Sequence, residues 1–286
     1  MYWTERRERM RALLAGDKCV HPGSVYDAVS ARIAEDIGFE VGMFAGSIGS
    51  LSVLGAPDLI TLTLTEFAAQ AYRICRAGNL ALLVDADHGY GNALNVRRTV
   101  EELETAGVSA LTIEDTVLPQ PYGSKGTTLI SLEEGVGKMK AALDGRQDKN
   151  LVVAGRTSAV AVTGVADAIK RAKAYQAAGV DAMFFAGIKT RKDLEAVAAE
   201  LKVPIFLGSI GPELSDKKYL ASVGVRIALQ GHQPIMAAIR ATYDTLKALR
   251  EGTPPSELKG VASSDLMKQV TRDKDFKRWT KEFLGG

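Results

Sequence analysis

Two aspartates follow an apolar run in the segment Leu82-Leu-Val-Asp-Ala-Asp-His-Gly-Tyr-Gly91. If residues 80–86 form a strand, side-chain alternation places Asp85 and Asp87 on one face, at the strand's C-terminal end. Two like charges in one small volume repel each other unless a cation or a shared proton relieves them. The pair therefore indicates a hard-metal site or an acid/base pair. The alternative is that Asp87 starts a turn or caps the next helix while Asp85 has an ordinary partner.

Other apolar runs also end in charged residues. Glu114 and Asp115 close the run at 110–115, and Arg156 closes the run at 151–156. Carboxylate oxygens suit Mg²⁺ or Mn²⁺ better than Zn²⁺, so we expect Asp85, Asp87 and Glu114 to hold such a metal, one directly and the others through water. The alternative is that Glu114 caps a loop and Asp115 pairs with a lysine. The permanent planar cation of Arg156 suits a carboxylate or a developing enolate oxygen.

Small residues after the run at 41–46 offer a second kind of contact. Ser47 carries a hydroxyl, and the backbone N–H groups from Ser47 through Ile48 and Gly49 form a cradle for an anion. A metal, an arginine and an amide cradle together describe a site for a small keto acid held by its charged ends. The alternative is that the glycines only turn the chain.

The three histidines lie at or just past the ends of apolar runs: His21, His88 and His232. A hydrogen-bonded structural role is open for each of them. We expect His232, where the last run gives way to a helix, to contact the substrate, and His88 mainly to shape its turn.

Four echoing segments describe the elements that must position these residues. Each has a glycine that ends a helical stretch shortly before an apolar run, which is typical of a junction between a helix and a strand: Gly38, Gly107, Gly179 and Gly224. Repetition of this junction predicts alternating strands and helices. The strands are expected near 18–22, 41–46, 80–86, 110–115, 151–156, 182–187, 204–209 and 226–231.

Helical periodicity lies between these strands, at 26–37, 64–76, 96–106, 132–143, 165–178, 191–201, 213–223 and 235–250. Eight such repeats predict a (β/α)8 TIM barrel, in which active sites lie at the C-terminal ends of the strands. A doubly wound sheet is the alternative, but no Gly-x-Gly-x-x-Gly follows the first strand and no Walker phosphate loop occurs.

The predicted barrel occupies residues 1–252 and includes an N-terminal helix at 4–15 that could plug its bottom. Residues 253–286 form a linker and a charged amphipathic helical tail. Because the tail's Phe276, Trp279 and Phe283 cannot belong to the barrel core, we expect it to pack over the barrel or on another subunit.

Composition limits the partners and the location. A net charge of +2, from 36 basic and 34 acidic residues, gives no reason to expect nucleic acid or an anionic membrane as a partner. The apolar runs are too short to span a bilayer, and the N-terminus lacks a signal peptide's apolar centre, so a cytoplasmic location is expected. Cys19 and Cys75 cannot form a disulfide framework and are expected to be packed thiols.

Five segments, in order and at comparable spacing, resemble the isocitrate lyase and phosphoenolpyruvate mutase superfamily over most of residues 18–250. They are Ala45-Gly-Ser-Ile-Gly-Ser, Ala56-Pro-Asp-Leu, Asp85-Ala-Asp-His-Gly-Tyr-Gly-Asn, Ile113-Glu-Asp and Gly155-Arg-Thr. The third is the most specific. With the Gly231-His232 strand end, it makes the chain most similar to the superfamily's oxaloacetate decarboxylase family.

The resemblance implies Mg²⁺ near Asp85, Asp87 and Glu114, with a keto acid or its enolate bound through Ser47, Arg156 and His232. It also implies that Asp58 serves the metal's water shell or the substrate, and that homodimers or homotetramers form, often by exchange of the eighth helix. The expected reaction is decarboxylation of oxaloacetate to pyruvate and CO₂.

Three other functions stay open: a carbon–carbon lyase acting on a substituted malate, a mutase acting on a phosphonate, and a non-catalytic metabolite-binding barrel. The loop Tyr122-Gly-Ser-Lys-Gly-Thr-Thr departs from the Lys-Lys-Cys-Gly-His loop of isocitrate and methylisocitrate lyases, so the resemblance does not extend to their cleavage chemistry. The Lys- and Asn-rich loop of the phosphonate enzymes is also missing, and the strand end Gly208-Ser-Ile-Gly carries no large polar side chain.

Overall fold

The computed structural model describes residues 3–285 and contains one sheet of eight parallel strands, paired in chain order. The strands are β1 (Gly23–Ser24), β2 (Val41–Phe44), β3 (Ala81–Asp85), β4 (Ala110–Glu114), β5 (Val152–Thr157), β6 (Ala182–Phe185), β7 (Ile205–Leu207) and β8 (Val225–Ala228). Val20, just before β1, forms a parallel bridge with Ile227 of β8. First and last strands therefore meet, and the predicted (β/α)8 barrel is confirmed.

The first strand differs from its predicted position at 18–22. Val20 alone in that range pairs with β8, and the named strand begins at Gly23. Pro22 separates the two pieces, and because proline has no N–H it cannot donate to a strand ladder. The other seven strands lie within the predicted ranges or within one residue of them.

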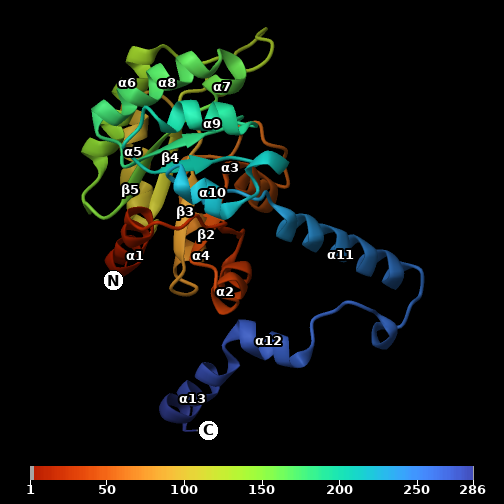
Figure 1. Ribbon diagram of the computed structural model, residues 1–286. Coiled ribbons are helices and arrows are strands. Elements are labelled where there is room, and N and C mark those ends of the chain that lie inside the picture. The colour runs from red at the N-terminus through yellow and green to blue at the C-terminus, as the bar shows by residue number, and fades with distance from the viewer. Residues whose placement is uncertain (1–2, 286) are drawn as a thin grey trace. The chain divides into compact units, whose positions relative to one another are not determined.

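Helix α1 precedes the first strand, and the other helices of the barrel unit lie between strands in the chain. They are α1 (Trp3–Ala15), α2 (Ala28–Asp36), α3 (Gly46–Gly49), η1 (Ser50–Leu54), α4 (Leu64–Cys75), α5 (Ala93–Thr105), α6 (Leu132–Gly145), α7 (Ala159–Val162), α8 (Val165–Ala178), α9 (Arg191–Ala198), η2 (Pro212–Leu214) and α10 (Lys217–Ser222). In Figure 1 the labelled strands run through the middle of this unit and the helices lie outside them. The longer helices of this unit therefore pack their apolar sides against the sheet.

Helix ends follow local side-chain chemistry. Thr63 and Glu66 form a capping box at α4, and the Asn92 side chain accepts the N–H groups of Leu94 and Asn95 at α5. The predicted helix at 213–223 is instead two pieces, η2 and α10, because the side chain of Asp216 caps a new helix there.

The four glycines expected at junctions between helices and strands do adopt left-handed backbone. Their φ angles are +90° at Gly38, +94° at Gly107, +104° at Gly179 and +86° at Gly224. A β-carbon disfavours this conformation, so glycine sets the point at which each helix turns back into the next strand.

Helix α1 lies against the N-terminal ends of the strands, as predicted. Its Arg7 donates to the carbonyl oxygen of Val108, just before β4, at 3.0 Å and to Asp148 at 2.9 Å. Its Arg11 pairs with Asp181, just before β6, at 2.7 Å. Because the strands are parallel, their C-terminal ends lie at the opposite end of the barrel, where the functional residues were expected.

The chain divides into two compact units, one ending at Gly231 and one beginning at His232. The second contains α11 (Gln233–Arg250), η3 (Pro255–Glu257), α12 (Ser264–Thr271) and α13 (Asp273–Leu284). The eighth helix thus groups with the tail, whereas the expected boundary lies after residue 252. Helix α11 exposes five large apolar side chains: Met236, Ile239, Tyr243, Leu246 and Leu249.

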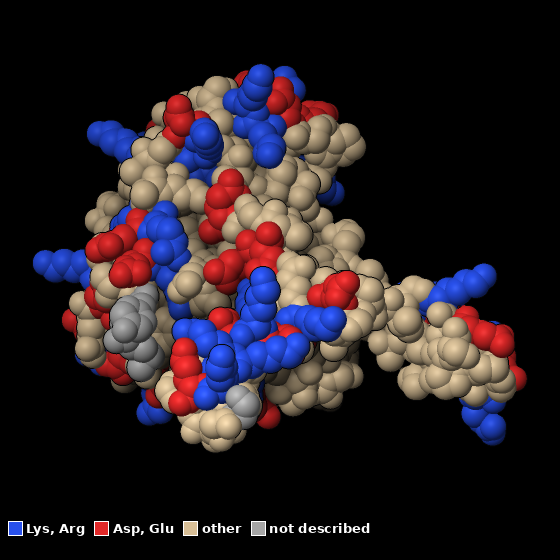
Figure 2. Space-filling model, turned by 90° about the horizontal axis from the view of Figure 1, so that it is seen from below, with Lys and Arg blue, Asp and Glu red and all other residues tan. Residues whose placement is uncertain are grey.

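Basic and acidic side chains lie side by side across the face drawn in Figure 2. This agrees with the nearly balanced charge of the sequence. Within residues 3–285, no helix combines the length and the apolar character needed to cross a membrane.

Candidate active site

The C-terminal ends of three neighbouring strands bring together the charged residues expected from the sequence. Asp85 ends β3, Glu114 ends β4, and Arg156 lies near the end of β5. The parallel register pairs Asp85 with Thr112 and Glu114 with Arg156. The predicted meeting of these side chains at one edge of the barrel is therefore confirmed.

Arg156 lies between two carboxylates. Its Nη1 pairs with Asp85 Oδ2, its Nε lies 3.3 Å from Glu114 Oε2, and its guanidinium lies 5.2 Å from the centre of the Phe184 ring. Burial lowers the pKa of Arg156, but the Asp85 and Glu114 carboxylates outweigh it and raise the pKa above its ordinary value. The arginine is thus a fixed positive charge at the site.

Threonine hydroxyls orient the two carboxylates. Thr112 donates to Asp85 Oδ1 at 3.0 Å, and Thr116 donates to Glu114 Oε2 at 3.0 Å. The Asp87 N–H also donates to Asp85 Oδ1, at 3.2 Å. Neither threonine was predicted as a site residue, although each lies two positions from Glu114 in the sequence.

Asp87 starts the turn after β3, and Asn92, not Asp87, caps the next helix. Burial, followed by the charges of Asp85 and Glu114, raises the pKa of Asp87 well above its ordinary value. Burial and the charge of Asp85 also raise the pKa of Asp58, so this residue shares the same electric field. Four acidic side chains, Asp58, Asp85, Asp87 and Glu114, therefore lie in the same electric field as Arg156.

Helix α3 approaches Asp87 closely. A β-carbon at Gly46 would lie 2.3 Å from Asp87 Oδ2, so any larger residue there would displace the Asp87 carboxylate. The N–H groups of Ile48 and Gly49 both donate to the carbonyl oxygen of Ala45, at 3.1 and 2.9 Å. The donors that this turn can offer an anion are therefore the Gly46 and Ser47 amides and the Ser47 hydroxyl. Substrate contact by Ser47, Ile48 and Gly49 stays a prediction.

The donor set fits a hard divalent cation bound partly through water. Asp85, Asp87 and Glu114 offer only oxygen atoms, which Mg²⁺ and Mn²⁺ prefer, and the raised pKa values of Asp87 and Glu114 reflect burial and mutual repulsion that a cation would relieve. Among residues 3–285, no three His, Cys, Asp or Glu side chains form a ready set of direct ligands. Magnesium commonly keeps several waters, so this arrangement fits one direct carboxylate and water-mediated contacts to the others.

Asp115, next to Glu114, faces away from this set. Its Oδ2 accepts from Tyr175 Oη at 2.8 Å and from Arg171 Nη1 at 3.1 Å, and the side chain is fully buried. Asp115 thus has a structural partner, but it is an arginine and not the lysine considered from the sequence.

The histidines have different surroundings. His88 is buried, and burial together with nearby Lys138 lowers its pKa to about 4, so it is neutral at pH 7 and fits the expected role in shaping its turn. His232 is the N-cap residue of α11 and the first residue of the second unit. Its contact with substrate stays a prediction.

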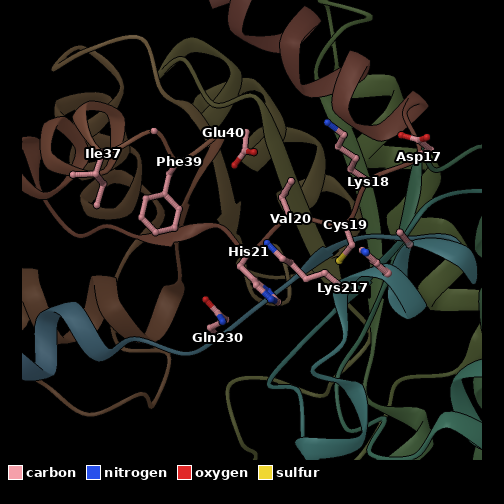
Figure 3. Close-up of a pocket in the computed structure, with 13 residues that line it drawn as sticks. Asp17, Lys18, Cys19, Val20, His21, Ile37, Phe39, Glu40, Lys217 and Gln230 are labelled. Atoms are coloured by element: carbon pink, nitrogen blue, oxygen red, sulfur yellow. The ribbon is translucent and has the colours of Figure 1, made fainter.

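His21 lies elsewhere, in a cavity of about 550 Å³ that Figure 3 shows. One nitrogen of its ring lies 2.7 Å from the carbonyl oxygen of Ala228. Cys19 lines the same cavity, and burial raises the pKa of its thiol to about 11. The cavity contains none of the site carboxylates, and Cys19 has the character of a packed thiol, as expected.

Comparisons with known proteins agree with this arrangement. The family model described as phosphoenolpyruvate phosphomutase matches residues 10–250. An oxaloacetate decarboxylase from Bradyrhizobium diazoefficiens is 61% identical over 285 residues, covering 100% of this chain and 99% of that protein.

Solved structures of two other enzymes share the fold at lower sequence identity. Oxaloacetate acetylhydrolase in complex with 3,3-difluorooxalacetate has a TM-score of 0.86 and 26% identity, covering 99% of this chain and 98% of its own. Phosphonopyruvate hydrolase with oxalate and Mg²⁺ has a TM-score of 0.85 and 27% identity, covering 98% of this chain and 99% of its own. The barrel, the carboxylates around Arg156 and the match over residues 10–250 lead to one conclusion: this chain belongs to the phosphoenolpyruvate phosphomutase family.

Proposed function

We propose that the protein is a carboxy-lyase that converts oxaloacetate to pyruvate and CO₂ with the help of Mg²⁺, or of Mn²⁺ in its place. The observation that carries this proposal is the 61% identity to an oxaloacetate decarboxylase over the whole chain. The site geometry alone fits several reactions of small keto acids. The sequence identity favours decarboxylation of oxaloacetate among these reactions.

In this proposal Asp85, Asp87 and Glu114 hold the cation, with Asp58 acting through its water shell. When bound, the cation stabilises negative charge on the keto oxygen of the substrate. The phosphonopyruvate hydrolase structure, with Mg²⁺ and oxalate on the same fold, supports this choice of metal and of an anionic ligand.

Arg156 supplies a fixed positive charge where the enolate oxygen develops as CO₂ leaves. Because Asp85 and Glu114 hold its guanidinium in place before substrate arrives, little reorganisation is needed in the transition state. The Ser47 hydroxyl and the Gly46 and Ser47 amides bind a substrate carboxylate, and His232 orients the departing one. Loss of CO₂ requires no protein nucleophile, which agrees with the burial of both cysteines, and a proton from solvent then converts the enolate to pyruvate.

Two further expectations belong to this proposal. The chain assembles as a homodimer or homotetramer, for which the exposed apolar side chains of α11 provide support. It works in the cytoplasm, a location compatible with two free thiols.

The experiment is product analysis with ¹³C-labelled oxaloacetate and Mg²⁺, followed by NMR. Equal amounts of pyruvate and CO₂, formed faster than with Mg²⁺ alone, are expected. Oxalate and acetate would instead assign hydrolysis, the reaction named for the acetylhydrolase relative. No turnover of oxaloacetate would move the search to substituted malates and phosphonates.

A further inference from the structure

The turn that carries Asp87 has an unfavourable backbone. Asp87 has φ 47° and Tyr90 has φ 60°, and between them Gly89 has φ 77°. Left-handed conformations cost residues with a β-carbon on the order of 1 kcal/mol each, so surrounding contacts must hold this turn.

Three successive carbonyl oxygens of the turn accept hydrogen bonds from three different elements. The Asp87 oxygen accepts from the Glu114 N–H of β4 at 2.8 Å. The His88 oxygen accepts from Lys138 Nζ of α6 at 2.9 Å, and the Gly89 oxygen accepts from Thr99 Oγ1 of α5 at 3.0 Å. The two side-chain donors are both buried.

Lys138 is the unusual member of this set. Its side chain is 2% exposed, and its ammonium forms none of the ion pairs found in the described part of the chain. Burying a lysine costs several kcal/mol, and an apolar residue would fill the same face of α6, beside Gly135, Met139 and Ala142, without that cost. Within residues 3–285, its ammonium donates to the His88 carbonyl oxygen, in the turn between β3 and α5.

We propose that Lys138 is a positioning residue for the metal site. By holding the His88 carbonyl oxygen, it keeps the strained turn in the conformation that sets the Asp87 carboxylate beside Asp85. Thr99 holds the carbonyl oxygen of the next residue, Gly89, with a neutral hydroxyl. The effect on turnover rests on the proposed function, but the effect on metal binding does not.

The test compares Lys138→Met with Lys140→Met, which removes an exposed lysine from the same helix. Mn²⁺ affinity is measured without substrate by electron paramagnetic resonance, and kcat, KM and the unfolding midpoint are measured alongside. Residues that support metal ligands typically contribute 10-fold to 100-fold in metal affinity, so we expect Lys138→Met to weaken Mn²⁺ binding about 10-fold and to lower kcat more than it changes KM. Lys140→Met should stay within about twofold of wild type in both, as a surface change should.

A stable Lys138→Met protein that binds Mn²⁺ and turns over like wild type, with only a lower unfolding midpoint, would reduce Lys138 to a structural role and overturn the proposal. If that variant does not fold, Thr99→Val, which keeps the shape and removes the hydroxyl, takes its place. Weaker Mn²⁺ binding is then expected, and wild-type binding would again overturn the proposal. If wild-type protein binds Mn²⁺ but does not decarboxylate oxaloacetate, the proposed function is refuted. The Mn²⁺ affinity of Lys138→Met then decides the role of Lys138 by itself.

Discussion

At the residue scale, the central feature is one arginine among several carboxylates. Sequence spacing predicts that Asp85, Glu114 and Arg156 meet, because all three end consecutive parallel strands, and the structure confirms it. Spacing does not predict Thr112 or Lys138 as partners. Which donors reach these groups depends on how strands and helices pack, although a lysine on the apolar face of a helix is a signal that could have been noticed.

Replacement of Arg156 tests its proposed role in charge stabilisation. Arg156→Ala should lower kcat by about 100-fold or more, because a preorganised charge at the developing oxyanion is lost. Arg98→Ala, which removes a mostly exposed arginine of α5, is the control and should leave kcat unchanged. Near-normal turnover in Arg156→Ala would exclude the proposed role.

The low pKa of His88 predicts how the free energy of unfolding changes with pH. The unfolded chain takes up a proton near the ordinary pKa of 6.5, whereas folded His88 stays neutral down to about 4. Its contribution is therefore complete above pH 6.5 and is lost as the pH falls toward 4, by roughly 3 kcal/mol in total. Urea unfolding of His88→Gln between pH 7 and 4 should show a shallower loss of stability than wild type. Identical slopes would show that His88 does not cause the loss.

At the element scale, the glycines at the ends of helices could be predicted because a left-handed residue is a local requirement. The first strand could not be placed correctly from local sequence. Its position depends on the pairing of Val20 with Ile227, some 200 positions away, and on the interruption of the strand at Pro22. The predicted helix at 213–223 is divided because the Asp216 side chain accepts the N–H groups of Lys218 and Tyr219 and starts a new helix. The hydrophobic periodicity of this segment does not show that cap.

Helix α1 provides a stability prediction at this scale. Arg7 is 4% exposed and joins α1 to residues before β4 and β5 through Val108 and Asp148. Arg7→Ala removes the donor to the Val108 carbonyl oxygen and a largely buried partner of Asp148, and should lower the free energy of unfolding by about 3 kcal/mol. Because α1 lies at the end of the barrel away from the carboxylates, kcat of the folded protein should not change. Glu8→Ala, on the exposed side of α1, is the control, and equal stability of the two variants would contradict this account of α1.

At the scale of the whole molecule, the alternating pattern of strands and helices was sufficient to predict the barrel. It did not predict that the eighth helix groups with the tail, since α11 has the same amphipathic pattern as a helix that packs on its own barrel.

The proposed assembly has a direct test in solution. Light scattering at micromolar concentration should give two or four times the chain mass of 30.5 kDa. Tyr243→Glu places a charge among the exposed apolar side chains of α11 and should shift the mass downward, whereas Lys247→Glu on the same helix should do so less. A wild-type monomer would refute the proposed assembly.

The most direct test of the central claim is the rate of pyruvate formation from oxaloacetate with Mg²⁺. Wild type is compared with Asp85→Ala, with Asp144→Ala as a control at an exposed aspartate of α6, and with wild type in excess chelator. Free Mg²⁺ itself speeds this decarboxylation, so each rate is corrected for the protein-free rate. We expect wild type and Asp144→Ala to form pyruvate at least about 100-fold faster than Asp85→Ala or the chelated enzyme. Equal rates in all four samples would contradict a metal-dependent decarboxylase built on Asp85.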